Sequence, residues 1–371
     1  MSLDVKASRE LQSEVLARSL CSLCGACVGM CPYWAAYKGR VVGLDECNLT
    51  QGRCYVFCPR TSLDLDLLSQ TVFGAPYAAD ELGTMQHVTM ARAKDDGIRA
   101  KAQYGGTVTA LTSFALEQGL IDAAVLTGSD DSMLPGGALA TSASQVRDRA
   151  GSNYVAAPTL AAFNRESGRE DVHRIGVVAT PCQALALAKM RASPLENRNN
   201  IDKLKLVIGL FCTWALRYDD FARFLAEKVP LGRIVKFDIP PPPANVFQVF
   251  SDSQRLDIPL DEVRPFIRSG CDVCLDMTAE FSDISVGAAE GVAGWNTLIV
   301  RTDAGRQLVE AAMAKGVIET QALPEANLAH LKEASLNKKK RGLKRVIEAS
   351  GSEENLLYLK LTGETVASLL A

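Results

Sequence analysis

Eleven cysteines among 371 residues offer the clearest chemistry in this sequence. Seven of them fall between Cys21 and Cys58, and the other four are Cys182, Cys212, Cys271 and Cys274. Disulfides are disfavoured in a reducing cytoplasm, so clustered thiols in such a chain indicate bound metal. The cysteines are therefore the first candidates for functional residues.

The first run of cysteines has the spacing of an iron–sulfur protein. Cys21, Cys24, Cys27 and Cys31, followed by Pro32, form the pattern C-x2-C-x2-C-x3-C-P, which resembles that of bacterial-type ferredoxins. Three thiolates at three-residue intervals wrap the chain around one cubane, and Gly25 relieves crowding beside the inorganic sulfide. Structural zinc favours two separated C-x2-C pairs instead, so zinc is the weaker alternative.

A second half-motif follows, as a two-cluster ferredoxin requires. The fourth cysteine of such a run ligates the other cluster. This resemblance assigns Cys21, Cys24, Cys27 and Cys58 to the first cluster, and Cys31, Cys47 and Cys54 to the second. Leu44 stands where the expanded form of the second motif has a cysteine, so the second cluster lacks one thiolate. It is either a 3Fe-4S centre or a 4Fe-4S centre with a non-cysteine ligand such as Asp45, and both alternatives stay open.

The remaining four cysteines follow apolar, strand-like runs or form a pair. Cys182 comes directly after the run 174–180, and Cys212 ends the run 203–212. Carboxyl ends of parallel strands meet at a ligand-binding crevice, so these two thiols can face each other. Cys271 and Cys274 form a C-x2-C pair that would complete a third 4Fe-4S site. Zinc, a redox dithiol or ordinary core cysteines fit the spacing equally well.

A glycine pair marks a candidate nucleotide site. Gly105 and Gly106 precede Thr107, the first residue of a predicted amphipathic helix over 107–119. Glycines let the backbone approach a ligand closely, and a helix start offers free N–H groups to a phosphate. Arg99 and Lys101 lie just upstream and would add positive charge. An ordinary tight turn with a helix cap has the same appearance.

The other elements indicate an α/β module behind the ferredoxin-like segment. Strands are predicted at 121–128, 174–180, 203–212, 283–287 and 297–302, and helices at 107–119, 183–193 and 303–316. Their alternation predicts a mostly parallel sheet covered on both faces. Residues 233–260 are predicted to be extended chain with a hairpin. The fold class is thus α+β and α/β, with a ferredoxin-like domain over 1–75, an α/β flavin and iron–sulfur module over 85–310, and a helical, surface-lying tail over 311–371.

Composition narrows the classes of partner. The chain is 47% hydrophobic and 22% charged with a net charge of −3, which gives no reason to expect a nucleic-acid partner. The basic run 338–345 is interpreted as a solvated helix face. No apolar run is long enough to span a membrane, and the first twenty residues do not resemble a signal peptide, so we expect a cytoplasmic protein.

Several segments together resemble one family. They are AQYGGTVTALTSFALEQGLIDAAVL, VVATPCQALALAKM, LVIGLFC, CDVCLDMTAEFSDISVG and GWNTLIVRTDAG, spread in order over about residues 90–310. The chain resembles the family of beta subunits of coenzyme F420-reducing hydrogenases and F420-dependent formate dehydrogenases. The same module occurs in F420-dependent sulfite reductase and in hydroxymethyl chlorophyll a reductase.

The resemblance implies FAD and one 4Fe-4S cluster in the core module. Cys182, Cys212, Cys271 and Cys274 match the cluster cysteines of the family, and Gln103, Gly105, Gly106 and Thr107 match its flavin segment. The implied function is an oxidoreductase subunit of a larger complex. It passes electrons through FAD between ferredoxin-type clusters and a hydride carrier such as coenzyme F420, with other redox subunits or ferredoxin as partners.

Two alternatives to that function remain. One is an electron-transfer adapter without a free substrate, and the other is a stand-alone reductase of a specific metabolite. No catalytic acid or base stands out in the sequence, and the three histidines, His87 and His173 among them, are expected to be surface or packing residues.

Overall fold

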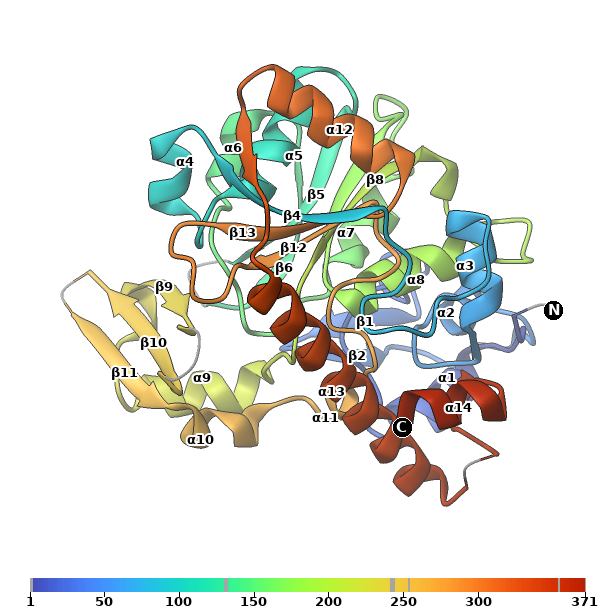
Figure 1. The fold of residues 1–371 in the computed structure, drawn as a ribbon. Coiled ribbons are helices and arrows are strands. Elements are labelled where there is room, and N and C mark those ends of the chain that lie inside the picture. The colour runs from blue at the N-terminus through green and yellow to red at the C-terminus, as the bar shows by residue number, and fades with distance from the viewer. Residues whose placement is uncertain (1–2, 130–132, 241–243, 253, 353, 371) are drawn as a thin grey trace.

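The computed structural model describes residues 3–129, 133–240, 244–252, 254–352 and 354–370. Within these residues an eight-stranded sheet forms the centre of the molecule (Figure 1). In sheet order its strands are β14 (Ile318–Gln321), β4 (His87–Ala93), β13 (Asn296–Val300), β12 (Ile284–Ala288), β8 (Leu204–Leu210), β7 (Ile175–Ala179), β5 (Ala123–Ser129) and β6 (Pro135–Ala140). The predicted strands that belong to this sheet are all present.

The sheet is mixed, so the expectation of a mostly parallel sheet is wrong. The pairings β12–β8, β8–β7 and β7–β5 are parallel, while the outer pairings on both sides are antiparallel. A short connection joins β12 to β13 and another joins β5 to β6, and short connections allow only antiparallel neighbours. Strands β4, β6 and β14 were not predicted. Strand β6 begins Pro-Gly-Gly and β14 has four residues, so neither carries a strong strand pattern.

Helices cover both faces of this sheet, as expected. Helices α4 (Asp96–Lys101), α5 (Thr107–Glu117), α6 (Ala143–Arg147) and α12 (Asp303–Ala314) pack on one face, where Leu111 and Phe114 of α5 are buried. Helices α7 (Leu160–Glu166) and α8 (Pro181–Arg191) pack on the other, where Phe163 and Leu187 are buried. The two apolar cores fix the strand ends that carry the site described below.

The N-terminal segment consists of short elements. They are α1 (Ser8–Leu11), which continues as a π-helical turn (Gln12–Leu16), β1 (Trp34–Tyr37), β2 (Arg40–Gly43), α2 (Arg53–Val56), β3 (Leu63–Asp64) and α3 (Leu65–Phe73). Strands β1 and β2 form a hairpin whose turn residues, Lys38 and Gly39, have φ of 44° and 73°, as a tight two-residue hairpin turn requires. This hairpin separates Cys31 from Cys47.

A second, small sheet stands beside the main one. Strands β9 (Ile234–Asp238), β10 (Val246–Ser251) and β11 (Arg255–Pro259) are antiparallel, which confirms the extended chain and hairpin predicted for this region. Helices α9 (Tyr218–Ala226) and α10 (Leu260–Val263) pack against it around Phe221 and Phe247. Helix α11 (Ser269–Asp272) leads back to the main body.

The C-terminal region is helical, as expected, but it is not merely surface-lying. Helix α13 (Glu325–Ser350) buries Ser335, Lys338, Lys339 and Gly342, and β15 (Leu359–Lys360) and α14 (Gly363–Leu370) follow. A Cβ on Gly342 would stand 2.6 Å from the carbonyl oxygen of Cys274, so glycine permits the close approach of this helix. Every helix in the described ranges is too short or too polar to cross a bilayer.

Candidate iron–sulfur and flavin site

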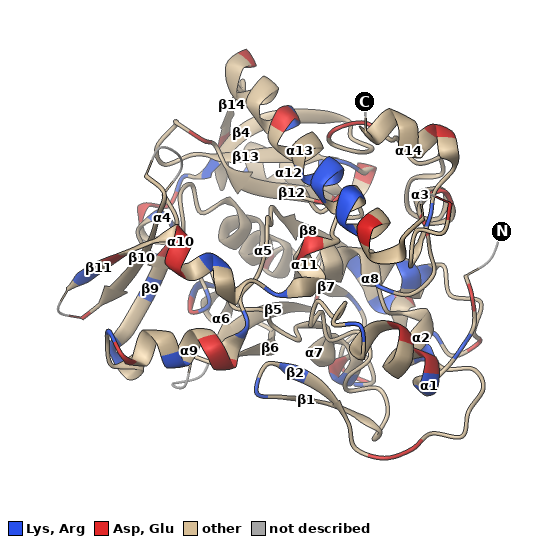
Figure 2. Ribbon diagram, turned by 90° about the horizontal axis from the view of Figure 1, so that it is seen from below, with Lys and Arg blue, Asp and Glu red and all other residues tan. Residues whose placement is uncertain are grey.

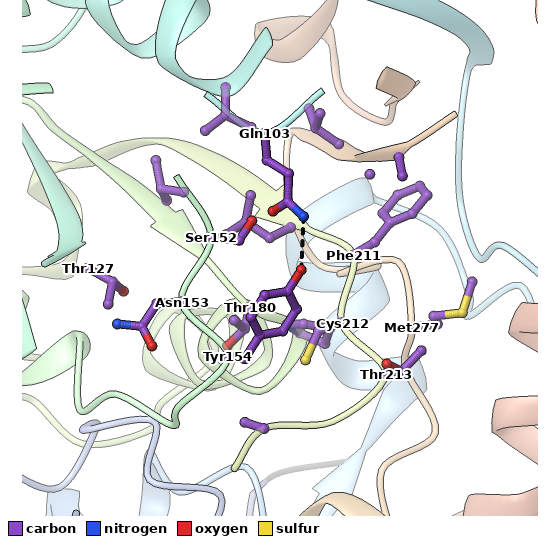
Figure 3. Close-up of a pocket in the computed structure, with 18 of the residues that line it drawn as sticks. Gln103, Thr127, Ser152, Asn153, Tyr154, Thr180, Phe211, Cys212, Thr213 and Met277 are labelled. Atoms are coloured by element: carbon purple, nitrogen blue, oxygen red, sulfur yellow. Dashed lines mark hydrogen bonds between the residues drawn. The ribbon is translucent and has the colours of Figure 1, made fainter. Parts of the chain in front are cut away.

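A cavity of about 520 Å³ opens at the carboxyl ends of β5, β7, β8 and β12 (Figure 3). This volume lies in the range typical of cofactor and small-molecule sites. The first turns of α5 and of α8 also line it. Two helix N-termini therefore border the cavity, an arrangement that favours anionic groups such as phosphates.

The four core cysteines all line this cavity. Cys182 is the second residue of α8, directly after β7, and Cys212 follows β8, so the strand ends bring together two thiols distant in sequence. Cys271 and Cys274 approach from α11 and the segment after it. The start of α8 is fixed because the Thr180 backbone N–H donates to Gln183 Oε1 at 2.8 Å. The structure thus brings the four thiols together, and their role as cluster ligands stays a prediction.

Two cations act on these thiols. Burial raises the pKa of Cys271 to about 11 and also raises the pKa of Cys212. Burial acts in the same direction on Cys274, yet the attraction of Lys338 and Arg60 outweighs it and lowers the pKa of this thiol. Metals bind the thiolate, so these cations favour the form of Cys274 that a cluster requires.

The seven N-terminal cysteines lie in two sets. The pKa of Cys27 is raised first by burial and then by repulsion from Cys21, Cys24 and Cys58. The pKa of Cys54 is raised to about 11, mainly by burial and then by repulsion from Cys31, with a smaller contribution from Cys47. These neighbourhoods have the grouping that the ferredoxin pattern predicts, and ligation itself stays a prediction. Cys24 is also close enough to Cys182 for their thiolates to repel, so the first set adjoins the core set.

The position of the missing thiolate lies at the surface. Leu44 is 64% exposed. Asp45 is exposed too, and its carboxylate accepts a hydrogen bond from the Glu46 N–H at 2.8 Å. Within the described residues, no three His, Cys, Asp or Glu side chains converge closely enough to hold a single metal ion.

Three of the four residues of the predicted flavin segment line the cavity. Gln103 points into it and donates to the Tyr154 hydroxyl at 2.8 Å (Figure 3) and to Asp238 Oδ1 at 2.5 Å. Gly106 has φ of 69° and begins α5 together with Thr107, and both line the cavity. Gly105 lies behind them, where a Cβ would stand 2.7 Å from Asn296 Oδ1.

Arg99 and Lys101 do not line this cavity. The Arg99 guanidinium is paired with Asp96 and donates to the Ala93 carbonyl at 2.5 Å, and Lys101 is exposed. Both residues belong to helix α4, whose last turn does not reach the cavity. The structure therefore argues against the prediction that they add positive charge to the flavin segment. Arg149 lines the cavity instead.

Several lining residues were missed by sequence reasoning. Asn296 Oδ1 accepts from the Thr107 N–H at 3.2 Å, and its amide donates to the Gly287 carbonyl, so it ties the start of α5 to β12. Tyr104 holds φ of 55°, a strained value for a bulky residue and one that clusters at functional positions. The position of Tyr104 between Gln103 and Gly105 could have marked it as a site residue in the sequence. Arg60 carried no such signal, because only the fold brings it to the cavity.

The basic run 338–345 lies in helix α13 and is only partly a solvated helix face, contrary to the interpretation from its composition. Its lysines and arginines appear as blue segments in Figure 2, and Arg341, Lys344 and Arg345 are indeed exposed. Lys338 is buried instead, with Nζ donating to the Cys212 carbonyl at 2.5 Å. Lys339 is also buried and paired with Glu280. Half of the run thus faces the protein interior, because the helix buries one stripe of its surface.

Two family models and several proteins of known name match this chain. Residues 88–164 match the family described as coenzyme F420 hydrogenase/dehydrogenase, beta subunit N-term, and residues 172–326 match the corresponding C terminus. The chain is 31% identical over 270 residues to coenzyme F420 hydrogenase subunit beta of Methanothermobacter thermautotrophicus, covering 71% of this chain and 95% of that protein. It is 29% identical to a subunit of the F(420)H(2) dehydrogenase of Methanosarcina mazei, covering 85% of this chain and 88% of that one.

Two further comparisons bear on fold and length. The chain is 28% identical to coenzyme F420-dependent sulfite reductase of Methanocaldococcus jannaschii but spans only 50% of its length. A chain of the solved F420-reducing [NiFe] hydrogenase complex from Methanosarcina barkeri matches with a TM-score of 0.67 at 28% identity, covering 72% of this chain and 93% of that one. The chain therefore belongs to the family of coenzyme F420 hydrogenase/dehydrogenase beta subunits, which confirms the resemblance seen in its sequence.

Proposed function

We propose that this chain is an iron–sulfur flavoprotein subunit that passes electrons between ferredoxin-type clusters and a hydride carrier, coenzyme F420 or a similar deazaflavin, through FAD. One observation carries the proposal: the four core cysteines and the Gly106–Thr107 segment line the same cavity. A one-electron centre and a two-electron cofactor would therefore lie within one site. The names of the relatives supply the candidate hydride carrier.

The residues present fit both groups. Cys182, Cys212, Cys271 and Cys274 would hold the core 4Fe-4S cluster. The starts of α5 and α8, with Arg149, would bind the phosphates of FAD. When bound, FAD takes up hydride as an electron pair and releases electrons singly. Apolar lining residues such as Phe211 and Met277 would exclude water from that part of the cavity.

The order of the thiol sets supports a linear route for electrons. Cys24 of the first ferredoxin set adjoins Cys182 of the core set, and Cys54 of the second set adds to the repulsion on Cys27 of the first. The proposed route therefore runs from the cavity to the first ferredoxin cluster and then to the second. Another redox subunit, or a ferredoxin, would exchange electrons there. Because free thiolates survive best in reducing surroundings, we propose that this takes place in the cytoplasm.

An anaerobic count of cofactors tests the proposal. Iron, sulfide, zinc and extractable flavin are measured per chain, and about eleven or twelve irons with about one FAD are expected. Cys212→Ala should lose about four irons while keeping both N-terminal clusters, and Cys54→Ala should lose the roughly three or four irons of the second ferredoxin cluster while keeping the core cluster. The intact protein should then reduce a deazaflavin when supplied with electrons from a reduced ferredoxin.

The alternatives give different results. About seven or eight irons with zinc and no flavin would contradict the proposal and favour the electron-transfer adapter. Full cofactor content without deazaflavin reduction, but with reduction of another metabolite, would favour the stand-alone reductase.

A further inference from the structure

A buried arginine lies between the first ferredoxin set and the core set. Arg60 is only 3% exposed and stacks over the Tyr358 ring at 5.2 Å. Its Nη2 donates to the Gly270 carbonyl at 3.1 Å and its Nη1 to the Pro59 carbonyl at 3.4 Å. Its Nε is buried without a partner in the described residues. The guanidinium therefore keeps one buried donor without an acceptor, and no carboxylate among the described residues pairs with it.

The position of Arg60 connects the two sets of thiols. Along the chain it follows Cys58 by two residues, and in space its carbonyl partner Gly270 precedes Cys271. Arg60 lines the cavity together with Cys182 and Cys274. Arg60 therefore lies beside the segments that carry thiols of both sets.

Two further buried cations each lie beside one set. Lys189 donates to Thr61 Oγ1 at 2.8 Å and to the Ser62 carbonyl at 2.9 Å, in the loop that follows Cys58. Lys338 donates to the carbonyl of Cys212. Among the described residues, no carboxylate lies at ion-pair distance from Arg60, Lys189 or Lys338.

Burial of such charges needs an anion. Moving a cation out of water costs several kcal/mol unless an opposite charge or a full set of hydrogen bonds compensates. Elsewhere this chain supplies one or the other: Lys339 is paired with Glu280, and every nitrogen of the Arg301 guanidinium has an acceptor. Beside the cysteines, Lys189 has three oxygen acceptors but no carboxylate partner among the described residues, and Arg60 keeps a buried Nε without an acceptor. Burial lowers the pKa of Lys189 to about 7, and an anionic cluster beside Cys58 would hold its proton.

We propose that Arg60 is a positioning residue for electron transfer, a fixed positive charge that raises the reduction potentials of the first ferredoxin cluster and the core cluster together. Lys189 adjusts the first cluster alone, and Lys338 the core cluster alone. One electron moves from one cluster to the other with no bond formed or broken, so matched potentials keep the step reversible. This inference rests on the proposed clusters and adds the residues that set their potentials.

The test is an anaerobic redox titration of each cluster, followed by electron paramagnetic resonance, in the intact chain. Arg60→Gln should lower the reduction potentials of both clusters by about 59 mV. For a one-electron couple this corresponds to a tenfold change in the ratio of reduced to oxidised cluster at a given potential. Lys189→Met should shift only the first ferredoxin cluster, and Lys338→Met only the core cluster. Arg60→Lys should retain most of the wild-type values. Arg341→Gln, on the exposed face of α13, is the matched control and should shift neither.

The outcomes separate this inference from the proposed function. A chain without iron overturns the proposed function itself. Clusters present with unchanged potentials in Arg60→Gln, or equal shifts of all three clusters, overturn the role of Arg60. If Arg60→Gln does not assemble its clusters, Lys189→Met and Lys338→Met test the inference instead. Each of these two variants must shift the reduction potential of its own cluster and leave that of the other unchanged.

Discussion

The buried pair of Lys339 and Glu280 should hold helix α13 against the segment that carries Cys274. Both side chains are almost fully buried, at 1% and 3% exposure. Tyr77 completes the group, since its hydroxyl donates to Glu280 Oε2 at 2.8 Å and accepts from Lys339 Nζ at 2.8 Å. Lys339→Met would leave the Glu280 carboxylate buried with only the tyrosine as partner. Breaking a buried pair from one side costs about 3–5 kcal/mol.

The expected loss is large against the total stability of a domain, about 5–15 kcal/mol. The double variant Lys339→Met/Glu280→Leu removes both charges and should recover most of it, because apolar replacement of a buried pair is often neutral or better. Lys332→Met is the matched control on the same helix. Its partner Glu81 lies 3.6 Å away and the two side chains are 40% and 35% exposed, so this variant should cost less than about 1 kcal/mol.

The assay is an anaerobic urea titration of the protein as purified, followed by far-ultraviolet circular dichroism. The midpoint should fall steeply for Lys339→Met, return for the double variant and barely move for Lys332→Met. Equal midpoints for Lys339→Met and Lys332→Met would refute the argument from burial. A double variant no more stable than Lys339→Met would show that the pair contributes more than mutual neutralisation.

Three further outcomes are expected. Leu44→Cys should add about one iron per chain by supplying the missing thiolate, and an unchanged iron count would show that the second cluster is already complete. Gly106→Ala should lower bound flavin, because its φ is 69° and a Cβ would stand 2.9 Å from a neighbouring side chain. Gly119→Ala, at φ of 64° with nothing near, is the control that shows backbone strain alone. Hydrogen bonding from Arg174 is the largest cause of a lowered pKa for Asp122. Asp122→Asn should therefore cost about 0.2–1 kcal/mol at pH 7 in this partly exposed pair, and the difference should vanish as the pH falls well below about 3.9. A difference that persists in acid would count against the ion pair.

Short-range patterns in the sequence predicted much of this architecture. The cysteine spacing predicted that the N-terminal thiols lie near one another, because a three-residue interval fixes local geometry, and their assignment to two clusters stays a prediction. Strand β7 was found within two residues of its observed bounds because its apolar run is unbroken, and helix α5 because a glycine pair precedes it and Gly119 follows it. The family resemblance contributed what spacing left open, namely the grouping of Cys182 with Cys271.

Features that depend on long-range packing could not be predicted in this way. A charged run such as 338–345 looks solvated when only its composition is considered, and the burial of Lys338 depends on a carbonyl far away in sequence. Arg99 is near the glycine segment along the chain, yet its helix directs it to Asp96 instead. The antiparallel edges of the sheet escaped notice because β14 has too few residues to show alternation.

The contact between β3 and β15 has a consequence for biogenesis. Leu63 pairs with Leu359, and the Leu63 N–H donates to the carbonyl of Tyr358 at 2.7 Å, so nearly the whole chain separates the partners. Contacts of such sequence separation form late and slow folding. The loop after Cys58 can be held by Lys189 and Gly270 as soon as those residues have been synthesised, but β15 can cover it only when almost the whole chain is made. Pairing of β15 with β3 therefore joins the first and last segments of the chain as a final step of folding.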